Sequence, residues 1–215
     1  MEGVKHVFKI KPFRIAKYPV TNLQFGAFLK AEDGYRNKKW WRDIEQSREP
    51  AQPQWQEANC PRENVSWYEA IAFCRWLSAK TGTSVRLPTE WEWQQAATGG
   101  DPTREYPWKG GWDASRCNSD ESRLRRTTAV GMYPQGATEQ AVLDMAGNIG
   151  EWCLNTDENP EQPKEIRIVK AGGGRVRRGG AWFGTPVDLR ASTRDGNFAV
   201  DRNSLIGFRL VQDIP

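Results

Sequence analysis

The stretch Asp144-Met145-Ala146-Gly147-Asn148-Ile149-Gly150-Glu151-Trp152 places two glycines among charged and aromatic residues. Most of the chain beyond residue 100 has this character, with short apolar runs separated by glycine-containing turns. Such a pattern is typical of short strands joined by tight turns. The best strand candidates are residues 127–132, 166–170 and 206–211.

Upstream of that stretch, three segments carry helix-start signals. Thr21 is a candidate N-cap before apolar residues at helical spacing. Ser66 and Thr89 each stand three residues before a glutamate, which is the capping-box pattern, and a glycine follows each predicted helix. A strand interrupted by Pro12 comes first, and residues 32–64 predict a long ordered loop. Helices followed by short antiparallel strands predict an α+β fold with two to three helices.

The composition favours one domain, 1–215, with an aromatic core. The chain has 215 residues, and its 11 Trp, 8 Phe and 5 Tyr compensate for sparse aliphatic residues. The net charge of +4 is too small to indicate a dedicated nucleic-acid site. Two basic clusters, residues 123–126 and 175–178, are therefore expected to be solvated strand edges rather than a phosphate-binding patch.

Targeting and metal signals are sparse. No run of about eighteen apolar residues predicts a membrane span, and the polar start lacks a signal peptide. We therefore expect a cytoplasmic location, and surface display through a partner stays open. The cysteines at 60, 74, 117 and 153 form no CxxC pair and are expected to be free, buried thiols. The single histidine, His6, argues against zinc and three-histidine iron sites.

Several motifs stand in a fixed order along nearly the whole chain. They are Pro19-Val20-Thr21-Asn22, Val65-Ser66-Trp67, Arg86-Leu87-Pro88-Thr89-Glu90-Trp91-Glu92-Trp93, the stretch 144–152 quoted above, Arg178-Gly179-Gly180-Ala181-Trp182 and Ile206-Gly207-Phe208-Arg209. This ordered set resembles the formylglycine-generating enzyme (sulfatase-modifying factor) family. The resemblance implies a variant of the C-type lectin fold that is low in regular secondary structure.

The chemistry of the family's enzymes is missing from the matching positions. The resemblance implies a copper site made of two cysteines, five residues apart, and the corresponding residues here are Gly184 and Leu189. Neither residue can bind copper(I), which needs soft thiolate ligands. The related iron-dependent sulfoxide synthases need several histidines. We therefore expect no copper, no iron and no catalytic residue, and an oxidase with atypical ligands is the least favoured alternative.

The chain resembles still better the variable proteins of diversity-generating retroelements. In these proteins a C-terminal variable region lies between segments like 178–182 and 206–209. Adenine-directed mutagenesis cannot produce Lys, Glu, Gln, Met or Trp, and none of these types occurs within 183–205 although they make up about a quarter of the chain. Turn-rich loops of any family member also favour Asn, Asp, Ser, Gly and Pro. The apolar residues in this stretch nevertheless favour a binding surface.

The resemblance thus implies a non-catalytic binding protein whose 183–205 segment is diversified to bind a protein or another macromolecule, with no signature of oligomeric state. The alternative is a non-diversified accessory or structural homologue. Five residues of the segment are expected to be scaffold: Arg190, Ala191, Ser192, Arg194 and Arg202. The predicted contact residues are Phe183, Gly184, Thr185, Pro186, Val187, Asp188, Thr193, Asp195, Gly196, Asn197, Phe198, Ala199, Val200, Asp201, Asn203, Ser204 and Leu205.

The resemblance also implies a structural calcium at the turn quoted first. Its ligands would be the side chains of Asp144 and Glu151 and the carbonyls of Gly147 and Ile149. An all-oxygen set of this kind suits a hard cation. The alternative is a glycine turn in which Glu151 pairs with an arginine.

Overall fold

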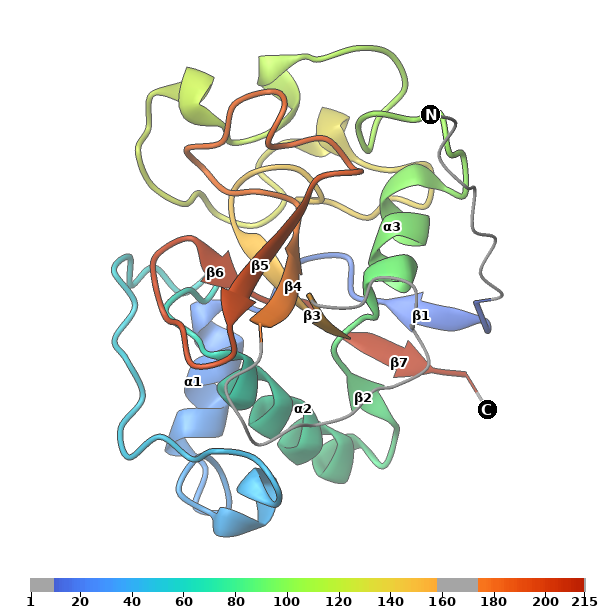
Figure 1. Cartoon of the computed structure of the whole chain (residues 1–215). Coiled ribbons are helices and arrows are strands. Elements are labelled where there is room, and N and C mark those ends of the chain that lie inside the picture. The colour runs from blue at the N-terminus through green and yellow to red at the C-terminus, as the bar shows by residue number, and fades with distance from the viewer. Residues whose placement is uncertain (1–9, 158–173, 215) are drawn as a thin grey trace.

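The computed structural model describes residues 10–157 and 174–214, whose arrangement is shown in Figure 1. The helices and strands in chain order are β1 (Phe13–Ile15), α1 (Asn22–Lys30), α2 (Trp67–Thr81), β2 (Val85–Arg86), α3 (Glu90–Thr98), β3 (Gly150–Thr156), β4 (Gly174–Arg178), β5 (Arg194–Phe198), β6 (Ile206–Gly207) and β7 (Val211–Asp213). Short 3-10 helices lie in the loops: η1 (Lys38–Trp41), η2 (Ala114–Arg116), η3 (Asp120–Ser122) and η4 (Pro134–Gly136). The predicted α+β fold is confirmed.

Each α-helix begins where the sequence predicts. The hydroxyls of Thr21, Ser66 and Thr89 accept a hydrogen bond from the backbone N–H three residues on, and the side chain of that later residue accepts one from the backbone N–H of the cap residue. These reciprocal bonds satisfy N–H groups that the first helical turn leaves without a partner. Helices α2 and α3 end at Gly82 and Gly99, whose φ angles of 68° and 65° favour glycine.

Two small sheets divide the strands. One has the order β1-β7-β2, and the other has the order β5-β4-β3-β6. Strands β3 and β6 are parallel, and the other pairs are antiparallel. The C-terminal strand β7 lies between β1 and β2 (Figure 1), so the two ends of the described chain share one sheet. Strand β5 stands at the edge of the second sheet, with β4 as its one neighbouring strand among the described residues.

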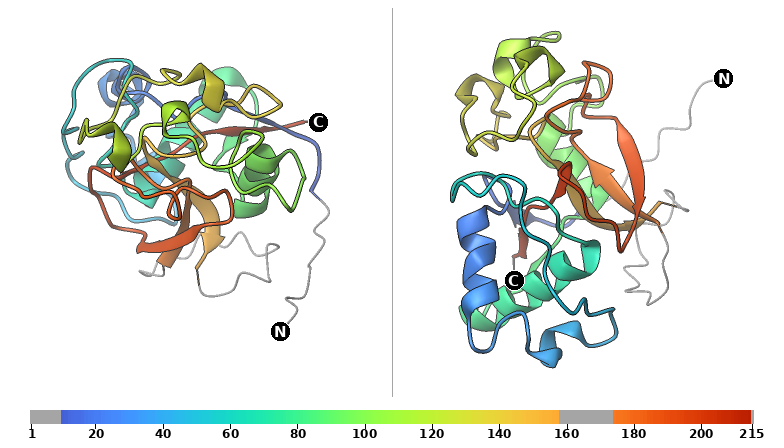
Figure 2. Two further views of the ribbon diagram at one scale, coloured as in Figure 1. Left: turned by 90° about the horizontal axis from the view of Figure 1, so that it is seen from above. Right: turned by 90° about the vertical axis from the view of Figure 1, so that its left-hand side faces the viewer.

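Helices α1 and α2 and the loops between residues 100 and 145 occupy opposite ends of the molecule. The right-hand view of Figure 2 shows α1 and α2 at the lower end, these loops at the upper end and the strands of the β5-β4-β3-β6 sheet at one side. Aromatic rings fill the interior on the helix side. The ring of Phe73 lies 5.7, 5.8 and 5.4 Å from those of Phe25, Phe28 and Phe208, and all four are buried. The predicted aromatic core is confirmed, and such rings bury large apolar areas.

Two strand predictions were wrong. Residues 127–132 form no strand, because their N–H groups bond to isolated partners: Thr128 donates to Asn148 Oδ1 and Val130 to the Asn59 carbonyl, both at 2.9 Å. The predicted strand 206–211 is split into β6 and β7, which join different sheets. The candidate 166–170 and residues 7–9 of the opening strand lie outside the described residues.

The expectation for the basic cluster 175–178 was also wrong. Arg175 and Arg178 lie on β4, an inner strand of its sheet, and their side chains are buried against tryptophans. Their guanidinium carbons lie 4.0 Å and 5.4 Å from the ring centres of Trp67 and Trp93, within cation–π range. The cluster 123–126 is largely exposed but belongs to a loop rather than a strand.

Candidate binding surface

The segment 183–205 forms two loops joined by β5 (Figure 1). We call residues 183–193 loop A, which lies near the top of that view, and residues 199–205 loop B, which lies at its left. Four large apolar side chains of this segment are solvent-exposed: Phe183 (49%), Val187 (61%), Phe198 (64%) and Val200 (48%). Exposed apolar side chains gathered on one segment are a feature of interaction surfaces.

The other predicted contact residues divide by burial. Gly184 and Ala199 are buried, so their assignment as contact residues was wrong. The backbone explains the second case, because the Ala199 carbonyl accepts a hydrogen bond from the N–H of Trp67 at the start of α2. Leu205 is half-buried and packs against the core. The remaining predicted contact residues are exposed or half-buried: Thr185, Pro186, Asp188, Thr193, Asp195, Gly196, Asn197, Asp201, Asn203 and Ser204.

Two arginines fasten β5 and loop B to the helices. Arg194 Nε donates to Glu90 Oε2 at 2.7 Å, and Arg202 Nε donates to Glu69 Oε2 at 2.8 Å. Both glutamates are 1% exposed and lie in the first turns of α3 and α2, where the helix dipole also favours negative charge. The two arginines therefore have the scaffold role expected of them, although the surrounding segment is largely exposed.

Loop A is held by backbone contacts. Arg178 donates to the carbonyls of Ala191 and Ser192 at 2.8 and 3.3 Å. The Tyr106 hydroxyl donates to the Pro186 carbonyl at 3.1 Å. Because these bonds bind main-chain oxygens, they fix the path of loop A whatever side chains it carries.

Gly184 and Leu189, the positions at which the resemblance implies copper ligands, lie next to each other. The Leu189 side chain is 0% exposed and packs with Tyr106 and Trp108. A Cβ added to Gly184 would lie only 2.7 Å from Leu189 Cδ2, so the leucine fills the space between the two positions. This part of the fold is an apolar contact under loop A.

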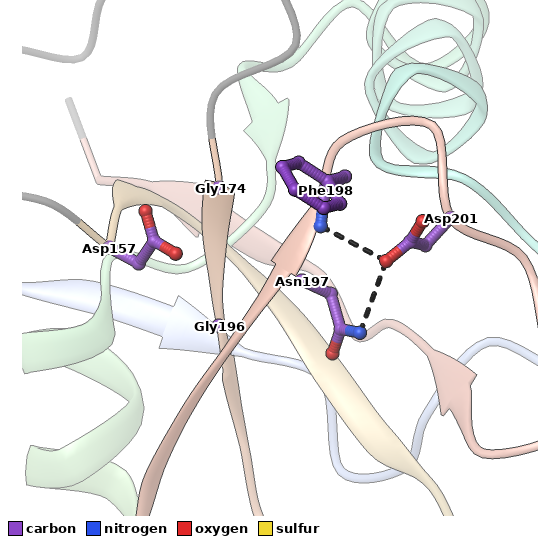
Figure 3. Close-up of a pocket in the computed structure, with 6 residues that line it drawn as sticks. All are labelled: Asp157, Gly174, Gly196, Asn197, Phe198 and Asp201. Atoms are coloured by element: carbon purple, nitrogen blue, oxygen red, sulfur yellow. Dashed lines mark hydrogen bonds between the residues drawn. The ribbon is translucent and has the colours of Figure 1, made fainter.

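A cleft of about 440 Å³ opens beside the end of β5 (Figure 3). Its lining residues are Asp157, Gly174, Gly196, Asn197, Phe198 and Asp201. The Asp201 carboxylate accepts hydrogen bonds from Phe198 N at 3.0 Å and Asn197 Nδ2 at 3.2 Å, which fixes the turn that follows β5. The binding surface therefore has a concave, acidic part beside an exposed phenyl ring. The sequence analysis missed Asp157 and Gly174, because only strand pairing brings the ends of β3 and β4 to β5.

The sequence analysis also missed Trp55. Its ring contacts the ring of Trp182, with centres 5.7 Å apart and planes at 88°. Trp182 in turn contacts Phe183, with ring centres 5.6 Å apart. Both tryptophans are half-buried, so the surface beside loops A and B includes a residue from the long loop before α2.

The predicted calcium ligands are engaged with other groups. Both oxygens of the Glu151 carboxylate accept hydrogen bonds from Arg209, at 2.6 and 2.7 Å, and Oε2 also accepts one from Trp93 Nε1. Asp144 Oδ2 accepts from Gly131 N at 2.7 Å, and burial raises the Asp144 pKa to about 6. Both carboxylates therefore already have hydrogen-bond partners within the chain. The geometry instead matches the alternative, a turn in which Glu151 pairs with an arginine.

Calcium binding has a direct test. We expect the thermal unfolding midpoint to be the same, within about 1 °C, in 2 mM CaCl₂ and in 2 mM EGTA. A bound ion would raise it, because a ligand that binds only the folded state stabilises that state. MgCl₂ at the same concentration controls for ionic effects. An increase specific to calcium would show that the turn rearranges to bind the ion.

The four cysteines are free and buried, as predicted. Burial raises the pKa of Cys117 to about 12 and that of Cys153 well above its ordinary value, so both thiols stay protonated. Within residues 10–157 and 174–214, no group of three or more His, Cys, Asp or Glu side chains could hold a metal ion. The helices in the same part of the chain are too short or too polar to cross a membrane.

The fold and the ordered motifs define a class, the sulfatase-modifying-factor type of C-type-lectin-like fold. The family described as "Sulfatase-modifying factor enzyme 1-like domain" matches residues 2–214. The chain belongs to this family.

Relatives within this family carry different names. The chain is 31% identical to a hercynine oxygenase of Mycobacterium tuberculosis over 99% of its own length and 55% of that protein. It is 28% identical to an inactive C-alpha-formylglycine-generating enzyme 2 of Bos taurus, over 97% of its length and 79% of that protein. The chain spans about half the length of the hercynine oxygenases it matches.

Solved structures share the fold. The structure of PvdO from Pseudomonas aeruginosa superposes with a TM-score of 0.75 and 25% identity, covering 95% of this chain and 81% of that one. Treponema denticola variable protein 1 superposes with a TM-score of 0.71 and 23% identity, covering 93% and 84%. At this identity, the second likeness is a likeness of fold.

Proposed function

We propose that this chain is a non-catalytic ligand-binding protein whose surface is formed by loops A and B and β5 and is diversified by a retroelement. One observation carries the proposal: four of the eight large hydrophobic side chains exposed among the described residues lie within 183–205. The segment makes up only about a tenth of the chain, so this is a local concentration. Exposed apolar groups on a fixed frame provide contact area without an ordering cost.

The segment 183–205 combines residues that hold its backbone with residues that are accessible to a ligand, which supports the proposal. Buried or ion-paired residues, namely Leu189, Ala191, Arg194, Ala199 and Arg202, hold the backbone. Most of the residues between them are exposed or half-buried, and none is of the five types that adenine-directed mutagenesis cannot produce. A surface of this design can change its contacts while the backbone stays in place.

The fold shared with Treponema denticola variable protein 1 also supports the proposal, because a protein named as variable uses the same scaffold. The bovine relative named as an inactive enzyme favours a second candidate, a non-diversified accessory homologue. In that candidate the frame is the same and the sequence of loops A and B is constant.

Sequencing the locus from many cells separates the two candidates. We expect substitutions confined to codons 183–205, at adenines of a near-copy template repeat, with a reverse transcriptase gene close by. They should spare Leu189, Ala191 and Ala199, whose side chains are buried. A uniform sequence without a template repeat would leave the accessory candidate.

The non-catalytic part of the proposal rests on Gly184 and Leu189, which offer no thiolate at the positions where the resemblance to formylglycine-generating enzymes implies copper ligands. We expect no copper-dependent oxidation of a cysteine-containing sulfatase peptide. Turnover in that assay, abolished by a copper chelator, would contradict this part. A positive copper assay would not bear on diversification, which the sequencing experiment tests.

A further inference from the structure

Trp55, Trp182 and Phe183 form one continuous run of rings at the surface. The ring centres are 5.7 Å apart between the first pair and 5.6 Å apart between the second. The edge-to-face geometry of the two indoles, at 88°, is a favoured arrangement of aromatic pairs. Phe183 is 49% exposed, and the two tryptophans are half-buried. We call these three residues the aromatic run.

The backbone of Trp55 is fixed from two sides. Glu63, whose carboxylate is 0% exposed, accepts hydrogen bonds through Oε1 from Gln54 N and from Trp55 N, the latter at 3.2 Å. Asn22 Nδ2, at the start of α1, donates to the Trp55 carbonyl at 2.7 Å. Burying a carboxylate costs free energy, and burial raises the pKa of Glu63. The buried Glu63 carboxylate therefore fixes the backbone at Gln54 and Trp55 in spite of the free-energy cost of its burial.

Trp182 is held on the other side. Its backbone N–H donates to the Asn148 carbonyl at 3.2 Å, and its indole Nε1 donates to the Ser204 carbonyl of loop B at 3.3 Å. The aromatic run thus connects the loop before α2, loop A and loop B. Its rings are pre-organised, which lowers the entropy cost of binding.

The polar groups around the aromatic run are mostly uncharged. Gln54 and Gln56 flank Trp55 and are exposed, and Asn203 and Ser204 are half-buried. Glu57, two residues after Trp55, pairs with Arg126. On the other side, exposed Asp120 donates its backbone N–H to the Gly184 carbonyl next to Phe183. Aromatic rings among neutral amide and hydroxyl groups are typical of protein-binding surfaces such as antibody paratopes.

Resting on the proposed function, we infer that Trp55 and Trp182, the two tryptophans of the aromatic run, are the fixed anchor of the binding surface and dock an uncharged apolar side chain of a protein partner. Trp55 and Trp182 lie outside 183–205, and tryptophan is a type that adenine-directed mutagenesis cannot produce. Two constant rings therefore border the segment that is proposed to vary. The constant rings supply affinity, and loops A and B supply specificity.

A random-peptide display library tests this anchor. Phage displaying random 12-residue peptides are selected on the full chain, and Kd values are measured for the enriched peptides as synthetic probes. We expect peptides with an aromatic or aliphatic residue at a constant position, and Trp55→Ala to weaken them by about tenfold or more. Trp55→Phe, which keeps a ring, should weaken them by less than about threefold. Ile214→Ala is the matched control, because Ile214 is a 43% exposed hydrophobic residue on the far side, next to β7.

Salt provides an independent readout. Because the side chains that flank Trp55 and Trp182 are mostly uncharged, raising NaCl from 50 to 500 mM should change Kd by less than about threefold, whereas binding through charged contacts would weaken steeply. Circular dichroism and urea unfolding identify any variant that fails to fold, and Trp55→Phe then gives the result.

The outcomes distinguish this inference from the proposed function. Peptides whose binding is weakened by Val187→Ala or Phe198→Ala but not by Trp55→Ala would overturn the anchor and leave the binding surface standing. Peptides that none of these changes affects, or a library that yields no binder, would count against both. Acidic or basic consensus peptides with strong salt dependence would overturn the uncharged partner.

Discussion

Replacing Arg209 by methionine is expected to lower the free energy of unfolding by about 3–5 kcal/mol. Arg209 and Glu151 form an ion pair in which both side chains are 0% exposed, with Arg209 Nε 2.6 Å from Glu151 Oε2. Arg209 also donates to the carbonyls of Ala16 and Leu143 at 3.0 and 2.9 Å. Methionine keeps much of the volume of arginine. It removes the positive charge beside the buried Glu151 carboxylate and the donors to these two carbonyls. Urea unfolding followed by circular dichroism measures the loss.

Two further variants show where that energy comes from. In Arg209→Met combined with Glu151→Leu, the leftover charge is gone, so part of the stability should return. Arg126→Met is the matched control, because Arg126 pairs with Glu57 at the surface, where the side chains are 41% and 51% exposed. Its expected cost is below about 1 kcal/mol. Equal costs for Arg209→Met and Arg126→Met would contradict a desolvated pair at the centre of the fold.

The features that the sequence predicted well are local. Capping at Thr21, Ser66 and Thr89 depends on residues three positions apart, and the glycine stops after α2 and α3 depend on one residue each. The ordered motifs predicted the fold by resemblance. They also located the segment 183–205, because its composition differs from that of the rest of the chain.

The features that the sequence missed depend on contacts between distant residues. Arg175 is buried because it packs over Trp67, more than a hundred residues earlier. The residues 127–132 look like a strand, but in the fold they have no neighbouring strand with which to build a ladder. Trp55 has no local signal that links it to Trp182. A single sequence contains no information on such pairs, so the aromatic run emerged only from the structure.

Leu189→Ala is expected to cost about 3 kcal/mol of folding free energy, whereas Val187→Ala, two residues away, should cost less than about 0.5 kcal/mol. Leu189 is 0% exposed and packs with Tyr106 and Trp108 beneath loop A, while Val187 is 61% exposed. Removing the leucine leaves a cavity between the loop and its aromatic support. Removing the exposed valine side chain breaks few contacts. The 2.8 Å hydrogen bond from Thr193 Oγ1 is kept, because it is accepted by the backbone carbonyl of Val187.

This pair of variants tests the central requirement of the proposed function, that one segment combines a rigid frame with a replaceable surface. Peptides selected for binding through loop A should lose affinity in Val187→Ala although its stability is unchanged. Leu189→Ala should lower the stability directly and should weaken peptide binding only by displacing loop A. Comparable destabilisation by both changes would mean that the exposed side chains also support the fold, and a segment of that kind could not be diversified freely.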